Sequence, residues 1–223
     1  KMAPAHSDMT AAGAVWGNSW DLEVPLYFAP QGFAETPSLK RSNAFDIVGG
    51  ECRAVRENVG LLDITGFSRF EVSGPNAEAW LNSVFATKLP APGRARLAVA
   101  LGHDGRLKGD LTLFNWGDGT WWIMGSYYLR RWHMRWFDDH IQDGVTIRDL
   151  GEEMAGFSLS GPNSRAVIKR LTDGPVGDLS FMGCGIFDIG LIRAKVGRLS
   201  VTGEAGYEIS CRMGGHIALR RML

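Results

Sequence analysis

Asp110 is an acidic residue inside a segment that otherwise has the composition of a β-strand. Two apolar runs, residues 97–101 and 106–114, flank a Gly-His-Asp-Gly sequence, and Asp-Gly between such runs predicts a tight hairpin. A carboxylate among residues that favour burial is costly unless it is paired or has a function, such as general base catalysis. The simpler alternative is that Asp110 shares a solvent-exposed strand face with Lys108 and Thr112, since side chains alternate between faces.

Composition limits the partners that this chain could bind. Its 223 residues, 45% of them hydrophobic, are typical of one or two soluble globular domains. Basic and acidic residues are equal at 24 each, so no basic surface is available for nucleic acid or an anionic membrane. Three cysteines without paired spacing favour a reducing compartment, and five scattered histidines form no metal-binding motif. We expect no membrane span, no metal, and a cytoplasmic location, or the mitochondrial matrix in a eukaryote.

An internal repeat supplies the elements that must position Asp110. The sequence FEVSGPN at residues 70–76 is echoed by FSLSGPN at residues 157–163. Each copy predicts a strand that ends in Ser-Gly, followed by a helix with proline near its start. Both copies then approximate the ferredoxin-like β-α-β-β-α-β pattern, so we expect an α+β fold with two related halves.

The predicted elements define three parts of the chain. These are a junction segment, a ferredoxin-like domain and a related discontinuous domain: residues 1–40, residues 66–150, and residues 41–65 plus 151–223. Helices are predicted at 77–85, 127–141, 164–171 and from 215, and strands at 96–101, 106–114, 120–125, 145–147, 181–188, 190–201 and 206–211. Trp121 and Trp122 alternate faces, which predicts that only one of them lies in a core. Ligand sites favour domain interfaces, so Asp110 and Glu204, one from each half, are expected near a shared cavity.

Three groups of residues together resemble the folate-dependent aminomethyltransferase family, typified by the glycine-cleavage T-protein. They are Asp110-Leu111 after the hairpin, the two Ser-Gly-Pro-Asn turns, and Thr202-Gly203-Glu204-Ala205-Gly206-Tyr207-Glu208. The resemblance covers most of the chain from about Ala54 to Ser210. It implies a cloverleaf of three domains around a channel that holds tetrahydrofolate. By this resemblance, the third of these domains, a small β-barrel, is expected to lie outside this sequence.

The leading segment is similar to one branch of that family. Residues 11–30 resemble the junction at which dimethylglycine and sarcosine dehydrogenases pass from their flavin portion into their folate portion. This chain would then be the folate portion of a flavoprotein, with FAD bound only by a flavin domain or subunit outside this sequence. Two departures leave the amine substrate open: Val24 stands where those enzymes usually carry Arg, and Leu22 where they carry Trp.

The resemblance implies roles for four residues. Asp110 would be the catalytic carboxylate, taking or relaying the proton that the folate nitrogen loses, which is typically worth ~10²–10⁴-fold in rate. Glu204 would bind the pterin, whose edge offers two adjacent N–H donors that one carboxylate can accept in parallel. Tyr128 could stack on a folate ring or simply pack at a helix start, and Tyr207, in the same motif as Glu204, completes the predicted cofactor-binding set. Glu208 is better explained as a solvated strand residue.

The predicted function is tetrahydrofolate-dependent transfer of a one-carbon unit from a small methylated amine such as dimethylglycine or sarcosine. Two alternatives stay open. Relatives of this fold demethylate sulfonium compounds or methyl ethers, and the residues Leu22 and Val24 leave room for such a donor. Other relatives are not enzymes but bind folate and assist iron–sulfur protein assembly, and the presence of Asp110 argues against that role.

Overall fold

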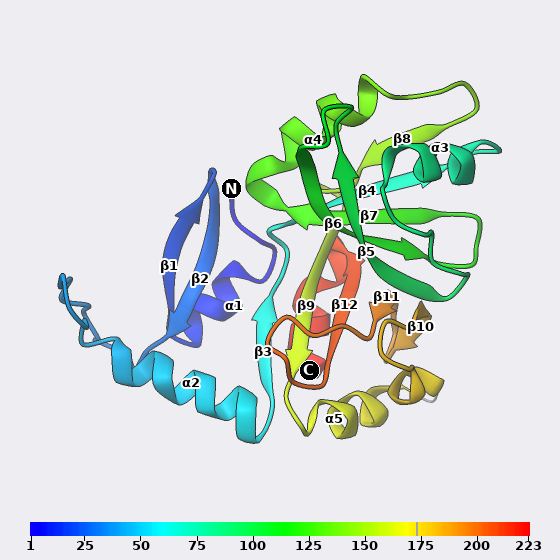
Figure 1. The fold of residues 1–223 in the computed structure, drawn as a ribbon. Coiled ribbons are helices and arrows are strands. Elements are labelled where there is room, and N and C mark those ends of the chain that lie inside the picture. The colour runs from blue at the N-terminus through cyan, green and yellow to red at the C-terminus, as the bar shows by residue number, and fades with distance from the viewer. Residues whose placement is uncertain (173) are drawn as a thin grey trace.

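Two five-stranded antiparallel sheets form the body of the molecule in the computed structural model, which describes residues 1–172 and 174–223 (Figure 1). The first sheet has the order β5 (Arg94–Leu101), β6 (Leu107–Asn115), β7 (Trp121–Ser126), β4 (Phe67–Ser73) and β8 (Thr146–Asp149). The second sheet has the order β10 (Cys184–Ile189), β11 (Ile192–Gly197), β12 (Gly206–Arg212), β9 (Met154–Ser160) and β3 (Gly60–Asp63).

The two sheets repeat one strand order, as the sequence repeat predicts. A strand and a helix lead into a three-stranded meander and a second helix in both halves. The helices are α3 (Ala77–Val84) and α4 (Arg130–Asp138) in the first half, and α5 (Ser164–Leu171) and α6 (His216–Met222) in the second. β8 is the edge strand of the first sheet, and β3 is the corresponding edge strand of the second. In the chain, β3 precedes all strands of the first sheet, whereas the other strands of the second sheet follow them. The α+β class and the duplicated halves are therefore as predicted.

Element boundaries differ from the prediction where turns intervene. Short 3₁₀ helices, η1 (Tyr127–Leu129), η2 (Pro175–Asp178) and η3 (Met213–Gly215), precede α4, follow α5 and precede α6. The expected helix 127–141 therefore starts as 3₁₀ and ends at Asp138. The expected strand 190–201 spans only Ile192–Gly197: it starts later because Gly190, at φ +56°, forms a turn before Ile192, and it ends four residues earlier than expected.

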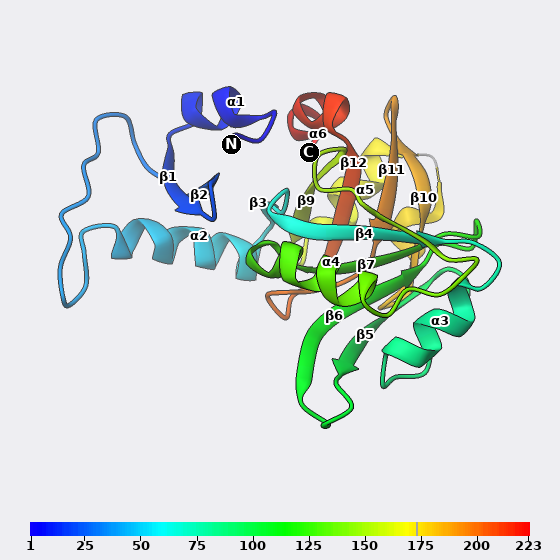
Figure 2. The same ribbon diagram turned by 90° about the horizontal axis from the view of Figure 1, so that it is seen from above.

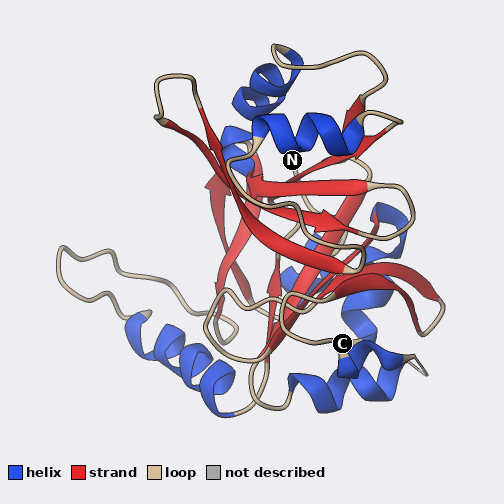
Figure 3. Cartoon of the chain, turned by 45° about the vertical axis from the view of Figure 1, so that its right-hand side comes forward, coloured by secondary structure: helices blue, strands red, loops and turns tan. Residues whose placement is uncertain are grey.

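Each sheet is covered by helices on its outer face and by the other sheet on its inner face (Figure 3). The inner contact buries Phe114, Trp122 and Met124 of the first sheet together with Cys184 and Leu199 from the second half. This arrangement corrects the expectation that only one of Trp121 and Trp122 lies in a core. Trp121 packs beneath the helices of the first sheet and Trp122 between the sheets, so both are buried.

The N-terminal part forms a separate layer beside the second sheet (Figure 2). It consists of α1 (His6–Ala11), the hairpin β1 (Ala14–Ser19) and β2 (Leu22–Phe28), and α2 (Phe45–Glu57). None of the residues of α2 is buried, although Ile47 and Val48 pack against a small cluster around Tyr27. The chain then enters the second sheet through β3, which pairs with β9.

Candidate functional site

Asp110 lies in the part of β6 that pairs with β5 but extends beyond β7. Its register partner in β5 is Val99, whereas pairing between β6 and β7 starts only at Thr112. Asp110 is exposed and points away from the helices, because Leu111 on the other face packs in the core under them. The carboxylate therefore lies on the inner face of the sheet, in line with Phe114.

The surroundings of Asp110 on this face are apolar and exposed. Leu97 and Leu101 lie on the same face of β5, and Leu107 lies near the end of the hairpin; all three are exposed. Lys108 and Thr112 share the face of Asp110, as the simpler sequence interpretation expected, and both are half-buried. Exposed apolar side chains grouped around a polar residue are typical of surfaces that bind a ligand or another protein.

The inner face of the second sheet has the opposite character, because its buried residues are polar. Phe157, Leu159, Tyr207 and Ile209 face the helices, so the alternate residues face the first sheet. Those residues are Ser158, Ser160, Glu208 and Ser210, each no more than 8% exposed. Glu208 is opposite Ser158 in the register of β12 and β9.

Glu208 corrects the sequence interpretation, which placed it in water. Burial raises the pKa of its carboxyl, and the positive charge of Arg69 opposes that rise. Among the described residues, its carboxylate has no hydrogen-bond partner that lowers this pKa. The criterion that singled out Asp110, an acid within an apolar strand, would have found Glu208 between Tyr207 and Ile209. The motif pointed instead to the turn at Glu204.

Phe114 connects the two inner faces. A Cβ added to Gly197 would lie 2.7 Å from the Phe114 ring, so this ring sits directly on β11. Gly197 is the register partner of Glu208 on β12. Phe114 is therefore one strand away from Glu208, and Asp110 lies four residues, about 13 Å, further along the same face of β6. The two carboxylates thus lie on the inner faces of different sheets. Glu208 lies where the sheets are in contact, and Asp110 lies where the first sheet is exposed.

Glu204 lines a cavity of about 700 Å³ at the edge of the second sheet. The lining includes Glu204, Thr202, Ser158, Ser160, Leu62 and Val55. The Glu204 N–H donates to Thr202 Oγ1 at 3.3 Å, which closes the turn, and its side chain is half-buried. Ser158 links this cavity to Glu208, because it lines the first and pairs with the second. Neither Glu208 nor Asp110 is among the lining residues, but Glu208 pairs with the lining residue Ser158, whereas Asp110 lies on the other sheet.

The two tyrosines lie elsewhere. Tyr128 is exposed in η1 and stacks on Trp20 at the tip of the β1–β2 hairpin, with ring centroids 6.5 Å apart. Tyr207 is buried on the helix side of β12, where its hydroxyl donates to the Gly177 carbonyl at 3.3 Å. The structure does not bring Tyr207 to the inner face, because it alternates with Glu208.

Among residues 1–172 and 174–223, which the structure describes, no cluster of three or more His, Cys, Asp or Glu side chains is placed to hold a metal ion. Within the same residues, no helix has both the length and the apolar character needed to cross a membrane.

The strand order and the repeated elements define a duplicated α+β fold, and sequence comparison identifies its family. The chain belongs to the family described as the GCVT N-terminal domain, whose model matches residues 5–220. It is 26% identical to human mitochondrial dimethylglycine dehydrogenase over 205 residues, covering 90% of this chain and 24% of that protein. It is 30% identical to the Bacillus subtilis aminomethyltransferase over 171 residues, covering 75% of this chain and 47% of that protein.

Solved structures show the same fold. Glycine cleavage system aminomethyltransferase T from Bartonella henselae matches with a TM-score of 0.83 and 21% identity, covering all of this chain and 56% of that one. A chain of the heterotetrameric sarcosine oxidase from Corynebacterium matches with a TM-score of 0.56 and 16% identity, over 83% of this chain and 95% of that one. The chain thus spans between about a quarter and a half of the length of the curated relatives named above.

Proposed function

We propose that this chain binds tetrahydrofolate and transfers to it a one-carbon unit from a methylated amine such as dimethylglycine or sarcosine, as the folate portion of a flavoprotein. The observation that carries the proposal is the buried Glu208, which pairs with the cavity-lining Ser158 and lies on the face that packs against the sheet bearing Asp110. Membership of the GCVT family and the likeness to a dimethylglycine dehydrogenase support the choice of donor. FAD would bind outside this chain, and the compartment would be the cytoplasm or, in a eukaryote, the mitochondrial matrix.

The residues present fit a folate. The cavity beside Glu204 has a volume within the usual range of small-molecule sites, roughly 300–1,000 Å³. Glu204 at its rim and Glu208 behind Ser158 are two carboxylates able to accept the paired N–H donors of a pterin edge. Tyr128 is exposed and would be free to stack on a folate ring. Tyr207 would instead hold β12 in place from the helix side of the sheet, through its hydrogen bond to the Gly177 carbonyl.

Bound tetrahydrofolate would supply the nitrogen nucleophile that receives the one-carbon unit. Asp110 would hold or take a proton at its carboxylate, and its negative charge would stabilise a cationic donor carbon nearby. The exposed leucines around Asp110 would exclude water once ligand covers them. Exclusion of water strengthens the interaction of this charge with a cation, because the local dielectric falls.

Calorimetric titration with tetrahydrofolate tests the binding roles. We expect Glu204→Ala to weaken binding by about 2–5 kcal/mol, the range for truncating one partner of a buried charged pair, and Glu208→Gln to weaken it similarly. Glu78→Ala on α3 is the matched control, because Glu78 is an exposed acid on the helix side of the first sheet. Wild-type affinity in both Glu204→Ala and Glu208→Gln would remove the proposed pterin site.

One observation keeps a second donor class in view. Leu22 and Val24, which stand where the resemblance leads us to expect Trp and Arg, lie beside Gly66: a Cβ added to Gly66 would be 3.4 and 3.8 Å from their side chains. A sulfonium or methyl-ether donor would leave a methyl group on tetrahydrofolate, whereas an amine donor would leave a methylene bridge. Identifying the product by mass spectrometry separates the two. Absence of any turnover, with folate binding intact, would favour the non-enzymatic folate-binding role.

A further inference from the structure

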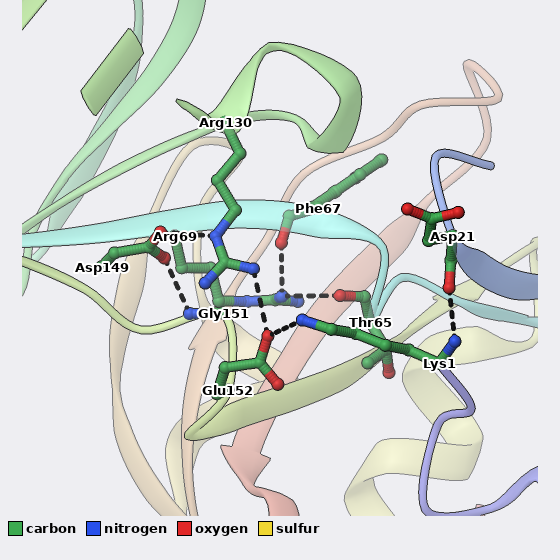
Figure 4. Close-up of polar contacts among 9 residues, drawn as sticks. All are labelled: Lys1, Asp21, Thr65, Phe67, Arg69, Arg130, Asp149, Gly151 and Glu152. Atoms are coloured by element: carbon green, nitrogen blue, oxygen red, sulfur yellow. Dashed lines mark hydrogen bonds and ion pairs between the residues drawn. The ribbon is translucent and has the colours of Figure 1, made fainter. Parts of the chain in front are cut away.

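Arg69 is a fully buried cation on the inner face of β4 (Figure 4). Its Nη1 donates to the Phe67 carbonyl at 2.9 Å and to the Thr65 carbonyl at 3.5 Å. Its Nη2 donates to the Ile64 carbonyl at 2.9 Å, and its Nε to Ser210 Oγ at 3.3 Å. The guanidinium is therefore fixed by the backbone just before β4 and by one side chain of the second sheet.

All four acceptors of Arg69 are uncharged, which is unusual for a buried guanidinium. Buried charges normally form ion pairs, because removal from water is costly. Here burial lowers the pKa of Arg69 to about 10, and the negative charges that oppose this are Glu208 first and then Asp63. Arg69 and Glu208 thus influence one another without direct contact.

Ser210 explains how this separation is maintained. Glu208 and Ser210 are two residues apart on β12 and share its inner face. Ser210 accepts from Arg69, so the guanidinium is held one side-chain position away from the carboxylate. A direct ion pair would have occupied the carboxylate oxygens that a ligand needs.

We propose that Arg69 is a positioning residue for ligand binding: its buried charge, held against Ser210, favours the anionic form of Glu208 over the protonated form while leaving the Glu208 oxygens free for the N–H donors of a ligand. This inference rests on the proposed function, because it takes Glu208 as a carboxylate that accepts from the pterin edge.

The other titratable groups near this pair do not replace Arg69. Asp63 lies beside His216, with Oδ2 3.7 Å from Nε2, and burial lowers the pKa of His216, which favours its neutral form. Lys195 is opposite Ser210 in register but is held by Asp118 at 3.5 Å and by the Trp116 and Trp122 rings. Burial raises the pKa of the Cys211 thiol to about 11, so it stays uncharged at neutral pH. Arg69 is therefore the cation whose charge opposes the rise in the pKa of the Glu208 carboxyl.

Carboxyl ¹³C NMR of the intact protein labelled at glutamate tests the charge effect directly, and Glu208→Gln assigns the signal. Arg69→Met should move the ionisation of Glu208 to higher pH. Arg69→Lys, which keeps a charge but not the fork, should leave it close to wild type. Ser210→Ala, which keeps the charge and loses one hydrogen bond, should shift it less than Arg69→Met does. An unchanged ionisation midpoint in Arg69→Met would overturn the proposal.

Arg69→Met could fail to fold, because three carbonyls lose their donor. The titration of the wild-type protein alone then tests the proposal, and a Glu208 that is still protonated at pH 7.5 would overturn the proposal.

Titration calorimetry with tetrahydrofolate as a function of pH connects the charge to binding. Affinity in the wild type should fall as pH falls through the Glu208 ionisation, and Arg69→Met should move that fall to higher pH, with at least a tenfold loss at pH 7 that is recovered at alkaline pH. A pH-independent loss in Arg69→Met would assign Arg69 a purely structural role and overturn the proposal. The two failures are distinguishable, because the NMR midpoint does not require ligand. A shifted midpoint with no folate binding in any variant, wild type included, would refute the proposed function alone.

Discussion

The two inner faces of this molecule are built on one strand order and yet carry carboxylates in opposite states. On the second sheet, Glu208 is buried among serines beside a fixed guanidinium. On the first sheet, Asp110 is exposed among leucines on a hairpin that extends beyond its neighbouring strand (Figure 2). The Glu208 carboxylate is already removed from water by the protein, whereas the Asp110 carboxylate would lose its water only when a ligand covers it.

This difference suggests a division of roles between the duplicated halves. A desolvated acceptor with free lone pairs is suited to binding, because a ligand that lacks the matching donors leaves it unpaired. An exposed carboxylate gains electrostatic strength only when ligand displaces water, so it is suited to acting on a bound substrate. We therefore expect changes at Glu208 to alter affinity and changes at Asp110 to alter turnover.

The largest expected effect is on turnover. Asp110→Asn should fold normally and bind tetrahydrofolate nearly as wild type does, while kcat falls by ~10²–10⁴-fold, because an amide cannot take a proton. Steady-state kinetics with dimethylglycine or sarcosine in the complete enzyme provide the measurement. Asp104→Asn, at the exposed tip of the same hairpin, is the control and should leave kcat unchanged. Normal turnover in Asp110→Asn would place Asp110 outside the catalytic site.

The contact between the two inner faces can be broken at Gly197. Ala in this position would bring a Cβ to 2.7 Å from Phe114 and 2.4 Å from Leu199, two side chains with no room to move in the inner core. We expect Gly197→Ala to lower the free energy of unfolding by about 1–3 kcal/mol, the usual cost of overpacking. Urea denaturation measures it. Gly214→Ala, where an added Cβ meets no atom within 4 Å, should be close to neutral, and equal stability of the two variants would contradict the packing described.

The buried state of Glu208 should appear in the pH dependence of stability. The folded-state pKa of Glu208 is raised above the ordinary 4.5, so the folded protein binds more protons than the unfolded chain between these values. Stability is therefore lost as pH rises through this window. Glu208→Gln should be more stable than wild type above the window, and the difference should vanish below pH 4.5. Thermal unfolding across pH would show parallel curves for both proteins if Glu208 were solvated.

The smallest effect is expected at Tyr128. Tyr128 is 54% exposed and its ring stacks on Trp20, so Tyr128→Ala should cost roughly 0.5–1.5 kcal/mol of stability, and Trp20→Ala the same. A larger loss of tetrahydrofolate affinity in Tyr128→Ala than in Trp20→Ala would support stacking of Tyr128 on a folate ring. Equal, small changes in both variants would limit Tyr128 to packing against the hairpin.

The sequence predicted elements better than it predicted surroundings. The helices 77–85 and 164–171 were found within one residue, because proline, glycine and apolar periodicity act locally. Glu208 and the Trp121–Trp122 pair were misjudged for a shared reason. Both judgements assumed a sheet with one wet face, and only the packing of the two sheets on each other buries the second face. Arg69 gave no local signal, since its partners Ile64 and Phe67 offer backbone carbonyls and Ser210 is distant in sequence.

A crystal structure of the protein with bound tetrahydrofolate, or with a stable reduced folate, would show whether the two inner faces share one ligand, which the buried carboxylate binds and the exposed carboxylate acts upon. We expect the pterin N–H edge to lie about 2.7–2.9 Å from a carboxylate of Glu208 or Glu204, with the reacting end of the ligand beside Asp110. A folate bound away from both glutamates, or with Asp110 still in open solvent, would contradict it.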